Sequence, residues 1–331
     1  MHRRTLLKGS LALSLSAALD PLVARAQDNW PSRNITIVVP APPGGQADLS
    51  ARPVAEQLRT LLGQSVIVEN RSGAGGATGN AAVARATPDG YTLLMTLSSV
   101  GVLPEAQKMF GRTPSYDIGQ LEPIARVLAD PTVLAVHASA PWKNVADLVA
   151  DAKQRPGVIT FASSGYYGAL HLAMEMFTHA AGIKLLHVPY RGGGPALADV
   201  LSGQVSCLAT APGPILQHKD RSVRVLACFG AQRIEAFPDV PTFQELGYKE
   251  IEFYLWTGLF AQKAVPTPIV TRLREAMSKA MADPGVVRNF GSVGSPPAYL
   301  DAPEFARFME VDNARLIDAV HKIGMIEGKL E

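Results

Sequence analysis

Short apolar runs rich in β-branched residues alternate with longer amphipathic segments along the chain from residue 34 onward. The clearest runs are Ile35–Val39, Ser65–Glu69 and Tyr91–Met95, and between them lie Asp48–Leu62 and a segment from Gly73 to about Ala86. Short runs of this kind are typical of buried strands, whereas apolar residues spaced three or four positions apart are typical of helices. The alternation predicts an α/β fold with mainly parallel sheets flanked by helices.

This alternation breaks at two places, where apolar residues continue without a helix. The first place comprises Ile124–Leu128 and Val133–His137, and the second is Phe253–Phe260. Further predicted strands are Val158–Ala162, Lys184–Val188, Val205–Ala209 and Val223–Phe229, and further helices are Val145–Lys153, Ala169–Ala181, Pro195–Leu201, Pro268–Met281 and Pro303–Ile317. We expect two lobes joined by two crossing segments, with residues 27–130 and 254–331 in lobe 1 and residues 131–253 in lobe 2. Two crossings would form a hinge on which a ligand closes the lobes.

The first 26 residues have the pattern of an export signal and are not expected to join the fold. A basic segment, His2–Lys8, precedes an apolar stretch from Leu11 to Leu19 and an A-x-A site at Ala24–Ala26. The pair Arg3-Arg4 is typical of a twin-arginine signal, and a general secretory signal with two arginines is the alternative. No later apolar run is long enough to span a membrane. We expect cleavage after Ala26 and a soluble, monomeric protein in the periplasm.

Composition narrows the class of protein further. The chain has 331 residues, of which 47% are hydrophobic and 18% charged, and this balance excludes a disordered protein. The formal net charge of +2 argues against a nucleic-acid partner, which requires a clustered basic face. Two cysteines exclude a disulfide scaffold and a cysteine-built zinc site. Both Cys207 and Cys228 fall in predicted strands, where buried free thiols are favoured and a disulfide between them is the alternative.

Four loops rich in small residues follow predicted strands. They are Pro42–Gly45, Gly73–Gly76, Ser163–Gly165 and Gly192–Gly194. In α/β sheets a ligand lies at the carboxyl ends of the strands, where glycine lets the backbone approach closely and helix N-termini favour an anion. Glycines also serve simply to make tight turns, but four such loops at one edge favour a site that holds a carboxylate or phosphate through backbone amides.

Motifs of enzymes match poorly, so we expect no catalytic residue, no cofactor and no metal. After Gly73 and Gly75 the dinucleotide fingerprint needs a glycine at position 78, which is Thr78. The sequence contains neither a G-x-S-x-G elbow nor a phosphate-binding G-x-x-x-x-G-K-[ST] loop, and its histidines lack metal-binding spacing. His171 fits a packed or capping residue as well as a ligand contact, and Asp48 fits a helix N-cap better than a ligand group.

Several motifs occur together in a fixed order. They are Ile35–Arg52, Val68–Gly76, Pro88–Leu93, His187–Ala196, Phe237–Thr242 and Trp256–Phe260. From about residue 30 to its end the chain resembles the solute-binding proteins of tripartite tricarboxylate transporters, also called Bug proteins. The resemblance implies a two-lobed Venus-flytrap fold that binds a small organic acid between its lobes. It also implies delivery of that acid to a membrane permease with a large and a small subunit.

The same resemblance implies that backbone amides and ordered waters grip a carboxylate of the ligand. The predicted ligand-binding residues are Pro43, Gly44, Gly45, Ala47, Asp48, Gly75, Gly76, Ser163, Ser164, Gly165, Tyr166, Tyr167, His171, Arg191, Gly192, Gly193 and Thr210. An exported nicotinamide-dependent oxidoreductase and a binding subunit that feeds a sensor kinase are the alternative functions.

Two departures from the family pattern concern the ligand. Tyr167 stands where the family has a glycine and Gly168 where it has a hydroxyl residue, and Ala47 replaces a common threonine or serine. If Tyr166 and Tyr167 face the cleft, their rings suit an aromatic or otherwise bulky monocarboxylate better than citrate, malate or succinate.

Overall fold

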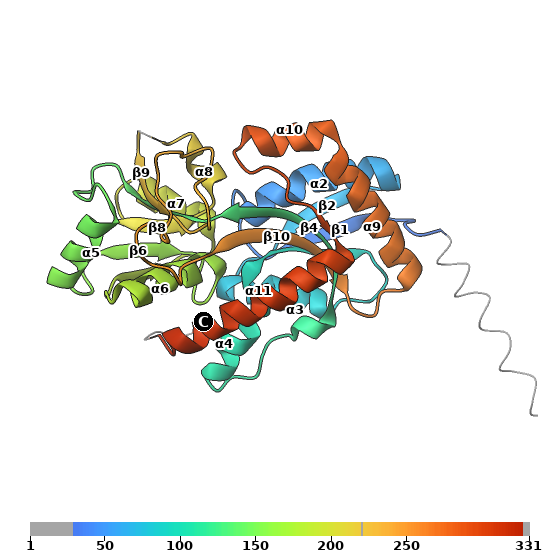
Figure 1. Ribbon diagram of the computed structural model, residues 1–331. Helices are drawn as coiled ribbons and strands as arrows, with labels where there is room; N and C mark the ends of the chain where they lie inside the picture. The colour runs from blue at the N-terminus through green and yellow to red at the C-terminus, as the bar shows by residue number, and fades with distance from the viewer. Residues whose placement is uncertain (1–28, 220, 327–331) are drawn as a thin grey trace, which may run out of the picture.

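The computed structural model describes residues 29–219 and 221–326 (Figure 1). The predicted export signal, residues 1–26, lies outside the described residues. None of the described helices combines the length and apolarity that a membrane crossing requires.

Lobe 1 is built on a six-stranded sheet, and we use this name for the sheet and the helices that cover it. Its strands are β1 (Ile35–Val39), β2 (Val66–Asn70), β3 (Thr92–Leu97), β4 (Leu121–Pro131), β10 (Tyr254–Gln262) and β11 (Leu300–Asp301), in the order β11-β4-β10-β3-β1-β2. β1 pairs in parallel with β2 and β3, whereas β10 runs antiparallel to both β3 and β4. The sheet therefore draws its strands from both ends of the described chain.

Helices cover both faces of this sheet because its strands bury both faces. Along β1, Ile35, Ile37 and Val39 pack into one core and Val38 packs into the other. The helices on the first face are α2 (Gln46–Leu62), α9 (Thr267–Ala282) and α10 (Pro284–Ser292), and those on the second are α3 (Ala77–Ala84) and α11 (Ala302–Ile323). Further short helices are α4 (Leu103–Met109) and the 3-10 turns Ala74–Gly76, Ser98–Gly101 and Ile118–Gln120.

Lobe 2 is built on a five-stranded sheet, and the name likewise includes its helices. The strands are β5 (Val133–His137), β6 (Thr160–Ser163), β7 (Leu186–Pro189), β8 (Cys207–Thr210) and β9 (Val223–Cys228), in the order β7-β6-β8-β5-β9. The helices are α5 (Val145–Gln154), α6 (Ala169–Ala181), α7 (Gly193–Leu201) and α8 (Pro212–Leu216). Figure 1 shows this green and yellow lobe beside the blue, orange and red elements of lobe 1.

The two sheets are mixed, and this corrects the expectation of mainly parallel sheets. Among the described strands, five of the nine pairings are antiparallel. The α/β, two-lobed fold itself is as predicted. Four of these five antiparallel pairs arise because β5 and β10 enter their sheets from the other lobe and so run against the local βα units, and the fifth joins the short β11 to β4.

The crossing segments lie side by side between the lobes. β4 runs into β5 after Thr132, and β10 returns beside it, with Tyr254 paired to Pro131. The amide of Thr132 donates to the carbonyl of Phe253 over 3.2 Å. Both crossings coincide with the apolar runs that broke the alternation in the sequence, while the hinge role and the division of the chain at residues 130 and 253 stay predictions.

The two cysteines are buried and free. Cys207 pairs with Val136 and Cys228 pairs with Val133, on opposite sides of β5. Two strand spacings separate them by roughly 10 Å between Cα atoms, beyond the ~7 Å that a disulfide bridges. Burial also raises the pKa of the Cys207 thiol to about 12. The prediction of buried free thiols is confirmed, and the alternative of a bridge is excluded.

Candidate functional site

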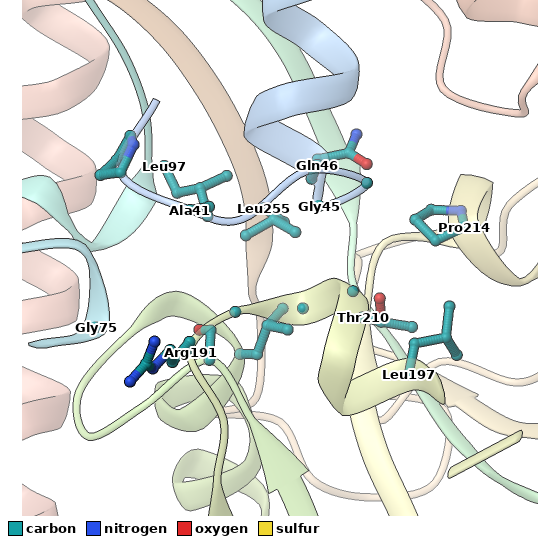
Figure 2. A pocket seen from close by; sticks show the side chains of 17 residues that line it. Ala41, Gly45, Gln46, Gly75, Leu97, Arg191, Leu197, Thr210, Pro214 and Leu255 are labelled. Atoms are coloured by element: carbon teal, nitrogen blue, oxygen red, sulfur yellow. The ribbon is translucent and has the colours of Figure 1, made fainter. Parts of the chain in front are cut away.

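A cavity lies where strand ends and helix N-termini of the two lobes meet (Figure 2). Lobe 1 lines it with Pro40, Ala41, Gly44, Gly45, Gln46, Gly75, Leu97 and Leu255, and lobe 2 with Ser164, Leu170, Arg191, Gly192, Gly193, Gly194, Leu197, Thr210 and Pro214. The cavity volume is about 40 Å³, which restricts an occupant to a small molecule.

Two helices begin at this cavity, one from each lobe. α2 starts at Gln46 after the N-cap Gly45, and α7 starts at Gly193 after the N-cap Gly192; neither has a side-chain cap. The first amides of a helix have no acceptor within the helix, and its N-terminus carries a partial positive charge. The two lobes together therefore offer an anion uncapped backbone N–H groups from both sides.

Asp48 organises the loop before α2 and does not line the cavity. Its carboxylate accepts hydrogen bonds from the amide of Gly44 at 3.0 Å, from Arg52 at 2.8 and 3.0 Å and from Asn70 at 3.0 Å. Burial works to raise the pKa of Asp48, but the hydrogen bonds from Arg52, Gly44 and Asn70 outweigh it and lower that pKa. The N-cap is Gly45, so the N-cap expectation for Asp48 is wrong, and the Gly44 amide is already occupied.

Two neighbouring serines in the loop after β6 have different roles. The hydroxyl of Ser163 lies 2.6 Å from Nε2 of His187 and accepts from the amide of Gly165 at 3.1 Å, so it shapes the loop. The hydroxyl of Ser164, on a residue that lines the cavity, is buried and has no hydrogen-bond partner among the described residues. A buried hydroxyl of this kind needs a ligand or a water as its partner.

One charged side chain, that of Arg191, is among the described residues that line the cavity. Arg191 is exposed at the cavity, and within residues 29–219 and 221–326 it forms no ion pair or hydrogen bond. No aspartate or glutamate is among the described lining residues. The charge of Arg191 therefore adds to the partial charges of the two helix N-termini, and the cavity favours an anion.

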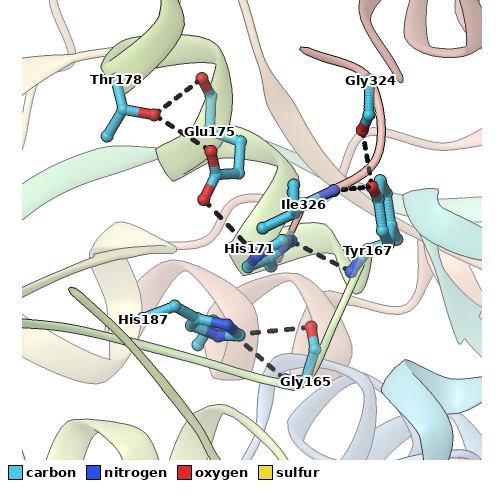
Figure 3. A network of polar contacts seen from close by, with 9 residues as sticks. Gly165, Tyr167, His171, Glu175, Thr178, His187, Gly324 and Ile326 are labelled. Carbon is cyan, nitrogen blue, oxygen red and sulfur yellow. Dashed lines mark hydrogen bonds and ion pairs between the residues drawn. The ribbon is translucent and has the colours of Figure 1, made fainter. Parts of the chain in front are cut away.

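Tyr167 points away from the cavity, which corrects the expectation that both tyrosines face it. Its ring is fully buried, and its hydroxyl donates to the carbonyl of Gly324 at 2.8 Å and accepts from the amide of Ile326 at 3.2 Å (Figure 3). Tyr167 has a φ of 54°, so the chain turns sharply there. Tyr166 places its ring edge-on to His187, with 4.8 Å between centroids, and does not line the cavity either.

Two histidines whose rings are tilted by 46° to each other support the same loop. The rings of His171 and His187 are 4.3 Å apart, and Nδ1 of His171 accepts from the amide of Tyr167 at 3.0 Å (Figure 3). Burial lowers the pKa of His187 to about 4 and that of His171 well below its usual value. Both rings are neutral near pH 7, and His171 is a fully buried support of the loop that does not reach the cavity.

Glycines allow the lobes to approach each other closely around the cavity. A β-carbon on Gly192 would lie 2.2 Å from Cδ of Pro42, and one on Gly75 would lie 2.8 Å from the carbonyl oxygen of Tyr166. Such distances are far below van der Waals contact, so only glycine fits at these two positions while the lobes stay together. In this structure Gly192 therefore lies close against Pro42, and Gly75 close against Tyr166, of the opposite lobe.

The sequence pattern that defines the tripartite tricarboxylate transporter family receptor matches residues 50–325. This chain belongs to that family. Protein BugT of Bordetella pertussis is 33% identical over 298 residues, which are 90% of this chain and 91% of BugT. The receptor therefore shares its family with Bug-type periplasmic binding proteins, as its motifs had indicated.

Solved structures agree with the fold of the receptor. The periplasmic binding protein BugD superposes with a TM-score of 0.84 at 31% identity, covering 89% of this chain and 99% of BugD. MatC from Rhodopseudomonas palustris with bound malate gives 0.81 at 26% identity and covers 88% of this chain and 99% of MatC. The R. palustris protein Rpa4515 with adipate gives 0.79 at 29% identity and covers 89% of this chain and 99% of that protein.

The cavity of the receptor includes about half of the residues that the sequence predicted. The predicted residues that line it are Gly44, Gly45, Gly75, Ser164, Arg191, Gly192, Gly193 and Thr210. The predicted residues that do not line it are Pro43, Ala47, Asp48, Gly76, Ser163, Gly165, Tyr166, Tyr167 and His171. Those in the second group lie in the same loops or in the first turns of the helices that follow them.

Sequence reasoning missed a mainly apolar part of the lining. The missed residues are Pro40, Ala41, Gln46, Leu97, Leu170, Gly194, Leu197, Pro214 and Leu255. Most of them follow a strand or begin a helix at the same sheet edges as the glycine loops. The expectation that residues at the carboxyl ends of strands contact a ligand was applied only to loops rich in small residues. Applied also to apolar residues, it would have included most of them. Leu255 lies inside β10, and no local signal marks it.

Proposed function

We propose that this receptor captures a small carboxylate in the cavity between its lobes and delivers it to a tripartite tricarboxylate-type permease with a large and a small membrane subunit. Cleavage of residues 1–26 after export would place the mature protein in the periplasm. Membership in a family of transporter receptors supports this function over that of a nicotinamide-dependent oxidoreductase.

The observation that carries the proposal is the unpartnered hydroxyl of Ser164 in a cavity with anion-binding character. The uncapped starts of α2 and α7 and the guanidinium of Arg191 surround the same space. A carboxylate accepts several hydrogen bonds at once, so it can satisfy the serine hydroxyl and the helix amides together. Malate and adipate, the acids in MatC and Rpa4515, support this class of ligand.

Replacing Ser164 with alanine tests the proposal. Ser164→Ala removes a hydrogen bond to a charged ligand, and affinity for the bound acid should fall roughly 10- to 100-fold, as expected for 1.5–3 kcal/mol. The ligand-free variant should be as stable as the original protein, because the lost hydroxyl had no partner. Calorimetric titration and thermal unfolding measure the two effects.

Ser202→Ala is the matched control, because Ser202 is exposed at the end of α7 and outside the cavity lining. If Ser164→Ala binds every acid as tightly as the original protein, the cavity is not the carboxylate site. Delivery to a permease is tested separately, by uptake of the identified acid into cells with and without the receptor gene. Unchanged uptake together with tight binding would favour a sensor kinase as the partner.

A further inference from the structure

Leucines from four different elements meet in the cavity. Leu97 at the end of β3 and Leu255 in β10 come from lobe 1, and Leu170 in α6 and Leu197 in α7 come from lobe 2. Leu255, Leu170 and Leu197 are at most 9% exposed. Ala41 and Pro214 add further apolar surface. Both lobes contribute to this apolar wall, so it is complete only when the lobes are together. A ligand therefore contacts the whole wall only in the closed form.

Polar and apolar groups take different ends of the lobe 2 side of the cavity. Figure 2 shows Arg191 on the side of Gly75, whereas Leu197 and Pro214 lie on the opposite side, beyond Thr210. A β-carbon built on Gly168 would lie 2.8 Å from the Ser164 hydroxyl and 3.3 Å from the carbonyl oxygen of Gly75, so this hydroxyl lies near Gly75, at the polar end. The cavity thus has one place for a carboxylate and an apolar region beside it.

A second carboxylate would find no second cationic side chain among the described lining residues. Arg191 is the only cationic side chain among the described lining residues. A dicarboxylate or tricarboxylate held by its first carboxylate would press another against leucine and proline, and burying an unpaired carboxylate is strongly unfavourable. An aliphatic or aromatic body gains free energy from the same contact, because it removes apolar surface from water.

We propose that the ligand of this receptor is a small monocarboxylic acid with an apolar body, such as a branched aliphatic acid or benzoate. This inference rests on the proposed function and names its substrate class. It replaces the argument from Tyr166 and Tyr167, which do not line the cavity, with one from the leucines that do. Leu197 is its selectivity-determining residue, since Figure 2 shows it on the side of Thr210 opposite to Arg191.

The test is calorimetric titration of the mature protein, residues 27–331, after unfolding and refolding to remove any carried ligand. Isovalerate and benzoate are compared with succinate, malate and citrate. At least one of the two monocarboxylates should bind ten times more tightly than each of the three polar acids. If succinate, malate or citrate binds as tightly as both monocarboxylates, the substrate class is wrong and the carboxylate function stands. If none of the five acids binds, the proposed function fails as well.

A variant pair locates the selectivity. Leu197→Gln keeps the side-chain length and a helix-compatible residue, and it should weaken binding of the preferred monocarboxylate about tenfold while changing succinate binding less than twofold. Leu201→Gln makes the same change on α7 outside the cavity lining and should alter neither acid. Equal weakening of all acids by Leu197→Gln would overturn its role. The comparison of acids in the unaltered protein does not depend on the folding of either variant.

Discussion

Asp130 is a carboxylic acid buried where β4 leaves lobe 1. It contacts Gln46, a residue that lines the cavity. Its Oδ2 accepts from Nε2 of Gln46 at 2.5 Å, and the same amide lies 3.4 Å from the hydroxyl of Ser295. Burial raises the pKa of Asp130 to about 7, although a hydrogen bond with Ser295 works to lower it. The folded protein therefore holds this carboxyl protonated at pH values at which the unfolded chain ionises it.

The variant Asp130→Asn should become more stable than the original protein as the pH rises. Between about pH 4 and pH 7 the unfolded chain has released the Asp130 proton and the folded protein has not, so the original protein loses stability through this group as pH increases. Asparagine does not ionise. Denaturant unfolding at several pH values should give an advantage that grows from pH 4 and levels off above pH 7 at roughly 1–3 kcal/mol. An advantage that is equal at pH 4 and pH 8 would contradict this assignment.

The histidine pair acts in the opposite direction over nearly the same pH range. The folded pKa of His187, about 4, lies below the value of an exposed histidine, so its contribution to stability is complete above about pH 6.5 and is lost as pH falls through 4. In the Asp130→Asn background the remaining stability should therefore fall with acidification. In the original protein the opposite effects of Asp130 and His187 partly cancel, so its stability depends less on pH than either group alone would make it.

Secondary elements were predictable where local sequence determines them. The helix Ala169–Ala181 was predicted with its observed bounds, because Gly168 and Gly182 flank a clear apolar periodicity. The start of α2 was misplaced by two residues, because Asp48 resembles an N-cap although Gly45 occupies that position. Strand direction was not predictable, since the neighbours of β10 are strands more than a hundred residues away in the chain.

The site was predictable only as a set of loops. Gly44 and Gly192 were recognisable from composition, but the direction of a side chain within a loop depends on contacts made elsewhere. For Tyr167 the deciding contact is with Gly324 and Ile326, more than 150 residues away. The sequence of the loop alone is equally compatible with a tyrosine that faces the cleft.

The segment after α11 is tied to the loop of lobe 2 by the Tyr167 hydroxyl. Tyr167→Phe removes both hydrogen bonds and keeps the ring that packs edge-on against Phe110. Amide hydrogen exchange at residues 324–326 should become faster, and unfolding should require about 1 kcal/mol less free energy. Tyr190→Phe is the control, because that hydroxyl bonds to Asp199 within lobe 2. Unchanged exchange in Tyr167→Phe would show that the packing of α11 alone holds the segment.

At the scale of the whole molecule, Gly192 should control closure of the lobes. Its φ of 169° is open to any residue, so Gly192→Ala leaves lobe 2 unstrained, yet the new methyl group would collide with Pro42 of lobe 1. The variant should keep its thermal stability and lose at least tenfold in ligand affinity. Small-angle scattering should show a radius of gyration that shrinks with saturating ligand in the original protein and stays large in Gly192→Ala.

Gly291→Ala is the matched control, because a β-carbon at that position of α10 meets nothing within 4 Å. It should bind and close as the original protein does. Full closure and unchanged affinity in Gly192→Ala would mean that Pro42 moves aside at little cost, and that the two lobes do not need bare backbone at this contact.

During synthesis β10 is made late, after the first 253 residues of the chain. In the sheet, however, this strand lies between β3 and β4. Until then those two strands lack the neighbour that joins them, and each presents an open edge. All five strands of lobe 2 precede β10 in the chain, so that sheet can be completed first. Completion of the lobe 1 sheet therefore requires a long-range strand insertion late in synthesis, a slow kind of folding step. A chain truncated before residue 254 would carry two unjoined halves of lobe 1, which is the form most prone to aggregate.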